Sequence, residues 1–280
     1  MLRNMLLLLE ATPSGRVAKT LACNIAATDD WHLTGLQIQD AGGTAFEDDF
    51  IVSPHSLFLD EFSDYQQYDA QPPLHNSRAG LEDKFFSDRS SYDETKVLTG
   101  PKYAVLSQEL EKNDLTIIGR DGNFAEQWTH NAKEIINLLL DYRARPIIIA
   151  PPDEPQANQN VLLAYDGSPG ASRAVQLFVL MGLAQKYNVH ALSVSRKKKV
   201  ARARIDIISR YLQAHGVDVV PHAIDSRSVP QEVINATISQ TQSSLVVAGA
   251  FGAANWRRNI FGSVSEYLIR YCPVPLFSCQ

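Results

Sequence analysis

Glycine and serine residues near the carboxy terminus have the types and spacing of a phosphate cradle. Gly249 and Gly252 are followed by Gly262 and Ser263, and the apolar run 245–248 comes directly before them. Glycine allows backbone N–H groups to approach an anion closely, and the N–H groups of a helix start favour negative charge. A buried strand, a glycine loop and a helix start in this order therefore predict a site for phosphate groups.

Simpler structural roles remain open for the same residues. Gly249 and Gly252 could form only the tight turn that leaves a strand. Residues 263–266 read Ser-Val-Ser-Glu, a capping box in which Ser263 and Glu266 satisfy the helix start between them. The roles are compatible, because a helix start with a hydroxyl group and free N–H groups can also bind phosphate.

The pattern Gly-x2-Gly-x9-Gly-Ser resembles the nucleotide-binding signature of the universal stress protein family. Residues 161–168 resemble the first strand and acidic turn of that family, and residues 262–268 resemble the start of its last helix. The resemblance implies a stress-response protein that binds ATP, or AMP or ADP, with Mg²⁺ as a candidate companion of the phosphates. The residues that it implies for nucleotide contact are Ala164, Tyr165, Asp166, Val194, Ala248, Gly249, Gly252, Ala253, Gly262, Ser263 and Val264.

Individual roles follow from the same resemblance. Asp166 would accept hydrogen bonds from the ribose or from the base edge, with capping of the helix near Pro169 as the alternative. Val194 ends a strand at the place where the backbone of the family meets adenine. Arg257 and Arg258 would neutralise terminal phosphates or remain solvated in their loop.

Strands and helices alternate in the second half of the chain. Strands are expected near 161–165, 188–194, 217–222, 244–248 and 274–278, with helical stretches between them. This alternation predicts an α/β fold, a doubly wound parallel sheet of Rossmann-like type with helices on both faces. Ligands bind such sheets at the carboxyl ends of the strands, at the switch point. With the strand order of the family, Asp166 and Gly249 would face each other there.

The chain is a diverged internal repeat. Residues 10–14 align with 166–170, and residues 115–122 align with 245–252. Two tandem domains are expected, at 1–152 and 158–280, joined by the proline-rich segment 151–155. We expect them to pair as a pseudo-dimer through their last strands, Ile147 to Ala150 and Val274 to Ser278, because the edges of such strands need covering.

The first copy departs from the signature. Lys133 and Glu134 stand where the second copy has Gly262 and Ser263, and Glu10 replaces Asp166. A glutamate at a helix start repels phosphate, so one nucleotide site per chain is expected. The first copy also holds an acidic insertion at about 40–100, with 13 acidic and 3 basic groups over residues 40–94. Aromatic residues within it leave both a packed and a disordered segment open.

Composition narrows the class of protein. Residues 1–155 carry 13 basic and 25 acidic groups, whereas residues 156–280 carry 13 basic and 6 acidic ones, which suits an anionic ligand in the second half. The early apolar run 5–9 is too short for a membrane span or a signal peptide, so a cytoplasmic location is expected. The basic run 196–204 lacks interleaved aromatics, and we interpret it as a solvated face without nucleic acid. A homodimer remains open.

A binding protein is the leading hypothesis for function. The 7 histidines and 3 cysteines show no metal-ligand spacing, and no Walker A lysine or catalytic base stands out, so no catalytic or metal residue is nominated and any ATP hydrolysis should be slow. One alternative is an ATP-using adenylate-transfer or pyrophosphatase enzyme, although its Ser-Gly-Gly-x-Asp-Ser loop is missing after residue 164. The other is a scaffold whose signature no longer binds a nucleotide.

Overall fold

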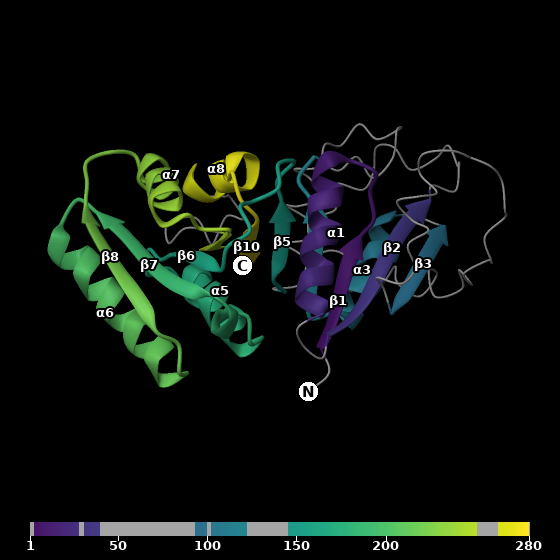
Figure 1. Cartoon of the computed structure of the whole chain (residues 1–280), viewed down its shortest axis with the longest axis horizontal. Helices are drawn as coiled ribbons and strands as arrows, with labels where there is room; N and C mark the ends of the chain where they lie inside the picture. The colour runs from purple at the N-terminus through teal and green to yellow at the C-terminus, as the bar shows by residue number, and fades with distance from the viewer. Residues whose placement is uncertain are drawn as a thin grey trace, which may run out of the picture.

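The computed structural model describes residues 3–27, 31–39, 93–99, 102–121, 145–250 and 263–279. The strands of these segments form a ten-stranded sheet in the order β3-β2-β1-β4-β5-β10-β9-β6-β7-β8 (Figure 1). Within each half the order corresponds to 3-2-1-4-5, and the second half repeats it in reverse across the sheet. The sheet therefore has the palindromic order expected of two copies related by a pseudo-twofold axis.

The strands of the first half are β1 (Arg3–Leu8), β2 (Trp31–Gln39), β3 (Glu94–Thr99), β4 (Leu115–Gly119) and β5 (Ile147–Ala150). Those of the second half are β6 (Asn160–Ala164), β7 (Asn188–Ser195), β8 (Val219–Asp225), β9 (Leu245–Gly249) and β10 (Leu276–Cys279). β8 ends later than the predicted 217–222, because its pairing with β7 continues as far as Asp225 opposite Ser195.

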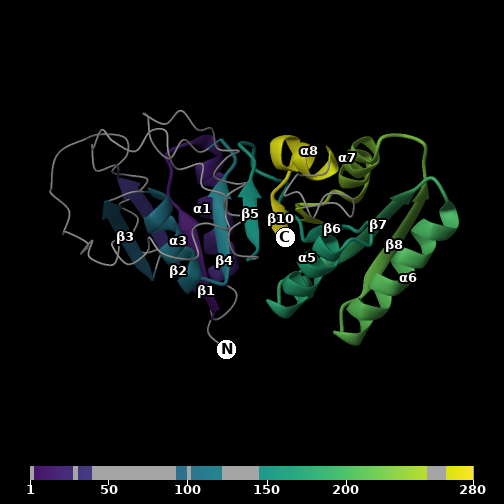
Figure 2. The same ribbon diagram turned by 180° about the vertical axis from the view of Figure 1, so that it is seen from behind.

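Helices cover both faces of the sheet, as a doubly wound α/β fold requires. α1 (Pro13–Ala26), α5 (Pro169–Leu180) and α6 (Lys198–Ala214) share one buried apolar cluster, the α5-side cluster. α3 (Lys102–Lys112), α7 (Pro230–Thr241) and α8 (Ser263–Tyr271) share the other, the α8-side cluster. The short 3-10 helix η4 (Ala184–Lys186) precedes β7. Seen from behind, the second half again has α7 and α8 along one side and α5 and α6 along the other (Figure 2).

The two halves meet through their last strands. β5 and β10 pair antiparallel, with Ile148 opposite Phe277, while every other strand pair in the described sheet is parallel. Phe277 is fully buried and lies edge-on to Phe178 of α5, with ring centroids 5.3 Å apart. The predicted pairing of the last strands is confirmed, since each final strand covers the edge of the other.

The first helix of each half begins with the same device. Thr12 caps α1 by accepting the N–H of Gly15 at 3.0 Å, and Ser168 caps α5 by accepting the N–H of Ala171 at 3.1 Å. A proline follows each cap and fixes the backbone for the first helical turn. Among the described residues, no helix combines the length and apolar character needed to cross a bilayer.

Candidate functional site

The ends of β6 and β9 lie side by side at the switch point of the second half. β9 pairs with one edge of β6, with Ala164 opposite Ala248, and β7 pairs with the other edge. The chain therefore leaves β6 toward α5 directly beside the point where Gly249 ends β9. A doubly wound sheet forms its ligand crevice at such a point. The predicted juxtaposition of Asp166 and Gly249 at neighbouring strand ends is present.

Asp166 organises the loop between β6 and α5. Its Oδ1 accepts the N–H of Ser168 at 2.9 Å, and Ser168 in turn caps the helix. The alternative capping role predicted for Asp166 thus belongs to Ser168, which Asp166 supports. Gly167 has φ of +79°, a conformation that side chains disfavour. Asp166 is exposed, so its carboxylate stays accessible to a ligand.

Gly249 is a glycine for a reason that its spacing does not reveal. A Cβ at this position would lie 2.4 Å from the backbone nitrogen of Ala171 and 2.6 Å from the carbonyl carbon of Gly170, so the start of α5 rests directly on the end of β9. Gly119, at the end of β4, has the same relation to α1, with a Cβ position 2.4 Å from the Oγ of Ser14. Close packing of strand and helix is therefore the role that both repeats share.

Apolar side chains line the other side of the strand ends. Ala164 of β6, Val194 of β7 and Val264 of α8 are partly buried and pack against the α8-side cluster, on the same face of the sheet. Ala248 is 7% exposed at the end of β9. Tyr165 points to the opposite face, where it is buried in the α5-side cluster with its hydroxyl 3.2 Å from Ser172 Oγ. At Tyr165, a ligand would meet the backbone rather than the ring.

The first turn of α8 is tied to the end of β9. Ser263 is the first residue of the helix and is exposed. Ser265, which sequence reasoning did not single out, donates its hydroxyl hydrogen to the carbonyl oxygen of Gly249 at 3.0 Å. Glu266 accepts a hydrogen bond from Arg270 at 2.9 Å. The helix start is thereby held beside the strand end, where its dipole favours an anion.

Part of the predicted site lies outside the described residues. This applies to the remaining glycines of the signature, to the two loop arginines, to their counterparts in the first half and to the acidic insertion up to residue 92. The residues concerned are Gly122, Lys133, Glu134, Gly252, Ala253, Arg257, Arg258 and Gly262. In the described part of the chain, no group of three or more His, Cys, Asp or Glu residues is arranged to hold a metal ion.

The corresponding position of the first half is occupied by its own side chains. Glu10 is buried at 6% exposure, whereas Asp166 is exposed. Ser14 Oγ accepts the N–H of Asp121 at 3.3 Å, directly after β4. Arg120 reaches across the β5–β10 junction and donates to the carbonyl oxygen of Cys272 at 2.7 Å. Burial lowers the pKa of Arg120, although nearby groups act to raise it.

Comparisons with known proteins agree with this architecture. Residues 157–278 match the model of the Universal stress protein family. Over the whole chain, the structure is similar to a universal stress protein from Archaeoglobus fulgidus DSM 4304, with 20% identity, a TM-score of 0.67, and 99% of this chain and 98% of that chain covered.

A functionally unknown protein from Pseudomonas aeruginosa PAO1 is similar with 14% identity and a TM-score of 0.57, covering 99% and 92% of the two chains. A universal stress protein family protein from Arabidopsis thaliana with AMP bound is matched with 12% identity and a TM-score of 0.34, over 43% of this chain and 90% of that chain. None of the curated proteins compared with the chain matches it. The likeness to the two full-length structures shows that the fold of the second half extends to the first.

Proposed function

We propose that residues 157–278, which match the model of the Universal stress protein family, bind one adenine nucleotide at the carboxyl ends of β6 and β9. The observation that carries the proposal is that a carboxylate, apolar side chains and a helix start all lie at this switch point. An exposed carboxylate lies at the end of β6, apolar side chains line the α8 side, and a helix start adjoins the end of β9. These surfaces suit a ribose, a base and phosphate groups respectively.

Each part of the nucleotide has a described partner in this arrangement. Asp166 accepts hydrogen bonds from ribose hydroxyls, since its carboxylate is accessible. The apolar patch of Ala164, Val194 and Val264 packs against the flat face of adenine. Ser263 and the first N–H groups of α8 receive phosphate, together with the loop Gly252 to Gly262 that the signature supplies. Mg²⁺ would accompany the phosphates of ATP.

We further propose that the first domain, residues 1–152, holds no nucleotide and serves as the partner of the second, residues 158–280. The hydroxyl oxygen of Ser14 already accepts a hydrogen bond from the backbone N–H of Asp121, so this N–H is not free for a phosphate group. In the second half Gly170 stands at the position of Ser14 and has no hydroxyl group to offer. Glu10 is buried where Asp166 is exposed, so the crevice of the first half lacks an accessible acceptor.

We propose that the site binds the nucleotide without hydrolysing it at an appreciable rate. Phosphoryl transfer needs a residue that orients the attacking water and charge stabilisation at the transferred group. The described part of the site offers backbone amides, hydroxyl groups and one carboxylate directed to the nucleoside. Such groups hold a ligand without favouring a transition state. We propose a cytoplasmic module that changes a partner surface when it binds ATP, ADP or AMP.

The test is titration calorimetry of ATP, ADP and AMP against the full chain, preceded by mass spectrometry of nucleotide retained through purification. Asp166→Ala and Ser263→Glu should each weaken binding by at least about tenfold, which corresponds to about 1.4 kcal/mol. Asp218→Ala and Ser239→Glu are matched controls, because both residues are exposed and neither contributes to the crevice. Bulky substitutions at Gly252 or Gly262 should abolish binding, and the same change at Gly122 should leave it unaltered.

Three results would contradict the proposal. The first is the absence of binding for all three nucleotides, which would favour a scaffold. The second is a stoichiometry of two equal sites, which would remove the asymmetry between the halves. The third is steady ATP turnover at about one per second or faster that is lost in Asp166→Ala or Ser263→Glu, which would favour an enzyme.

A further inference from the structure

Two histidines from neighbouring strands face each other away from the proposed nucleotide site. His190 Nδ1 of β7 and His222 Nε2 of β8 are 3.0 Å apart, with ring centroids 5.3 Å apart and ring planes inclined by 31°. In the register, His222 lies opposite Leu192, so His190 is its diagonal neighbour on the same face of the sheet. The backbone of two paired strands therefore holds the two ring nitrogens together.

This face of the sheet is open at its outer edge. Leu192 lies opposite His222 and two residues after His190, so all three side chains are on the same face of the sheet. Because Leu192 belongs to the α8-side cluster, this is the face that α7 covers. α7 packs mainly on β6 and β7, while β8 is the outermost strand (Figure 1). Val220, two residues before His222, is 48% exposed on the same face. Solvent and ions can therefore reach the histidine pair.

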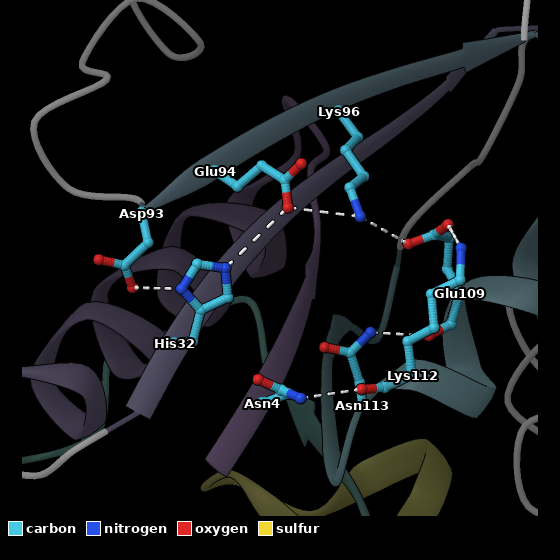
Figure 3. Close-up of polar contacts among 8 residues, drawn as sticks. All are labelled: Asn4, His32, Asp93, Glu94, Lys96, Glu109, Lys112 and Asn113. Atoms are coloured by element: carbon cyan, nitrogen blue, oxygen red, sulfur yellow. Dashed lines mark hydrogen bonds and ion pairs between the residues drawn. The ribbon is translucent and has the colours of Figure 1, made fainter. Parts of the chain in front are cut away.

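In the first half, charged side chains fill the position that is equivalent to the histidine pair. Lys96 of β3 lies opposite Leu36 just as His222 lies opposite Leu192. Its Nζ contacts Glu109 of α3 at 3.2 Å and Glu94 at 3.4 Å, and Lys112 contacts Glu109 at 2.6 Å. Figure 3 shows these charges joined in one chain of contacts beneath β3. α3 thus supplies a buried carboxylate at the outer strand.

The second half supplies no such carboxylate from α7. By the repeat, Ser239 takes the place of Glu109, and its hydroxyl is engaged with the carbonyl oxygen of Asn235 in its own helix. Burial lowers the pKa of both His190 and His222, and the proximity of His222 lowers that of His190 further. In the hydrogen-bonded pair one ring nitrogen donates and the other offers its lone pair, and a metal ion requires a lone pair on both.

The separation of the two nitrogens matches a pair of ligands on one metal ion. With metal–nitrogen bonds of about 2.0–2.1 Å, two adjacent ligands are ~2.9 Å apart at a right angle and ~3.3 Å apart at the tetrahedral angle. The observed 3.0 Å lies between these values. Coordination also requires each lone pair to point ~35–45° away from the line that joins the two nitrogens, so both rings must rotate out of their hydrogen-bonded orientation.

We propose that His190 Nδ1 and His222 Nε2 bind one divalent transition-metal ion of the class that prefers imidazole, such as Cu²⁺, Ni²⁺ or Zn²⁺. The hydrogen that bridges the rings moves to an outer ring nitrogen, so both rings stay neutral and no net proton is released. Water fills the other positions, because the described residues provide no third His, Cys, Asp or Glu ligand. The affinity of the site should follow the Irving–Williams order of divalent metal ions, in which Cu²⁺ binds most tightly.

The test uses the full chain without a histidine tag, titrated at pH 7 with each metal ion in a buffer that does not chelate. Calorimetry should show one Cu²⁺ per chain, and the Cu²⁺ electron paramagnetic resonance spectrum should show two nitrogen ligands. His190→Gln and His222→Gln should each weaken binding by at least about tenfold. His215→Gln is the matched control, because His215 is exposed at the end of α6 with its ring against Tyr211.

The proposal fails if the two variants bind the metal as tightly as the natural sequence, or if His215→Gln weakens binding to the same degree. It also fails if the natural sequence binds no metal. A measurement without substitution guards against misfolding: protons compete with the metal ion for both ring nitrogens, so binding to the unaltered chain must weaken as the pH falls. Adenine-nucleotide titration of the same variants should be unchanged, which separates this site from the proposed nucleotide site.

Discussion

Alanine at Gly249 and at Gly119 tests whether these glycines serve packing or phosphate binding. If Gly249 only made room for phosphate, Gly249→Ala would reduce nucleotide binding without loss of stability, and Gly119→Ala would have no effect. If both glycines let a helix start rest on a strand end, both substitutions destabilise the fold. The structure predicts the second outcome, because an added Cβ would lie 2.4 Å from the backbone nitrogen of Ala171 in α5 at Gly249, and 2.4 Å from Ser14 Oγ and 2.8 Å from the backbone nitrogen of Gly15 in α1 at Gly119.

Two opposing contributions decide whether each alanine substitution raises or lowers the free energy of unfolding. Neither glycine is among the described glycines with positive φ, so alanine fits the backbone at both positions. In open space the substitution would stabilise a strand residue by about 0.5–1 kcal/mol. A contact of 2.4 Å forces the helix away by roughly an ångström, and overpacking of this kind costs about 1–3 kcal/mol. The net change is therefore a loss of stability at both positions.

Urea unfolding of the full chain, followed by circular dichroism, measures this change as a shift of the midpoint at constant slope. A thermal melt should show a fall of about 2–4 °C for each kcal/mol lost. The critical variant is Gly119→Ala, because the first half is not expected to bind nucleotide. An unchanged or raised midpoint for Gly119→Ala would refute the packing argument, whatever happens to binding in Gly249→Ala.

Two further predictions concern the polar contacts of the first half. Arg120→Met should lower the free energy of unfolding by about 1.5–3 kcal/mol, since it removes a charged hydrogen bond to the Cys272 carbonyl across the β5–β10 junction. Arg120→Lys should lower the free energy of unfolding by less. If urea titration shows that the Arg120→Met variant is as stable as the natural chain, the prediction is contradicted. Burial acts to raise the pKa of Glu109, but hydrogen bonds from Lys112 and Lys96 lower it overall, so its stabilising effect is present above the ordinary pKa of glutamate and is lost as the pH falls through the lowered value. Glu109→Gln should therefore be less stable than the natural chain at pH 7 by about 1–3 kcal/mol, and the difference should shrink as the pH falls below the ordinary pKa of glutamate; a difference that stays constant on acidification would exclude the ionised carboxylate as the cause.

The sequence predicted the parts of the fold that depend on local pattern. Apolar runs such as 245–248 mark buried strands, and the repeat, the short linker and the need to cover strand edges predicted the pairing of the two last strands. The strand order that the family resemblance implied placed Asp166 and Gly249 at neighbouring strand ends. These predictions succeeded because strand periodicity, turn chemistry and the handedness of crossovers leave few arrangements for a repeated α/β unit.

Contacts that depend on three-dimensional approach were not predictable in this way. The spacing identified Gly249 but not the approach of Ala171 that requires it. Nothing in the run Ser263 to Glu266 indicated that Ser265 would bind the Gly249 carbonyl. The histidine pair showed no metal spacing, since its members are 32 residues apart and meet only through strand register. Each of these contacts joins separate elements, which local patterns do not encode.

The two halves share one backbone frame and differ in the side chains at the ends of their strands, which is the physical basis for proposing that one binds a ligand and the other supports it. The backbone relation between strand end and helix start is the same in both, as Gly119 and Gly249 show. The differences lie in side chains placed on that frame. Ser14 and Arg120 commit the first copy to internal contacts, one to its own loop and one to the other half. At the corresponding places the second copy has Gly170 and Ala250, which make no side-chain hydrogen bonds and leave polar groups of the crevice to a ligand. The expected consequence is that Gly170→Ser would weaken nucleotide binding in the second half while leaving its strands in place, whereas arginine at the fully buried Ala250 would also disturb the core.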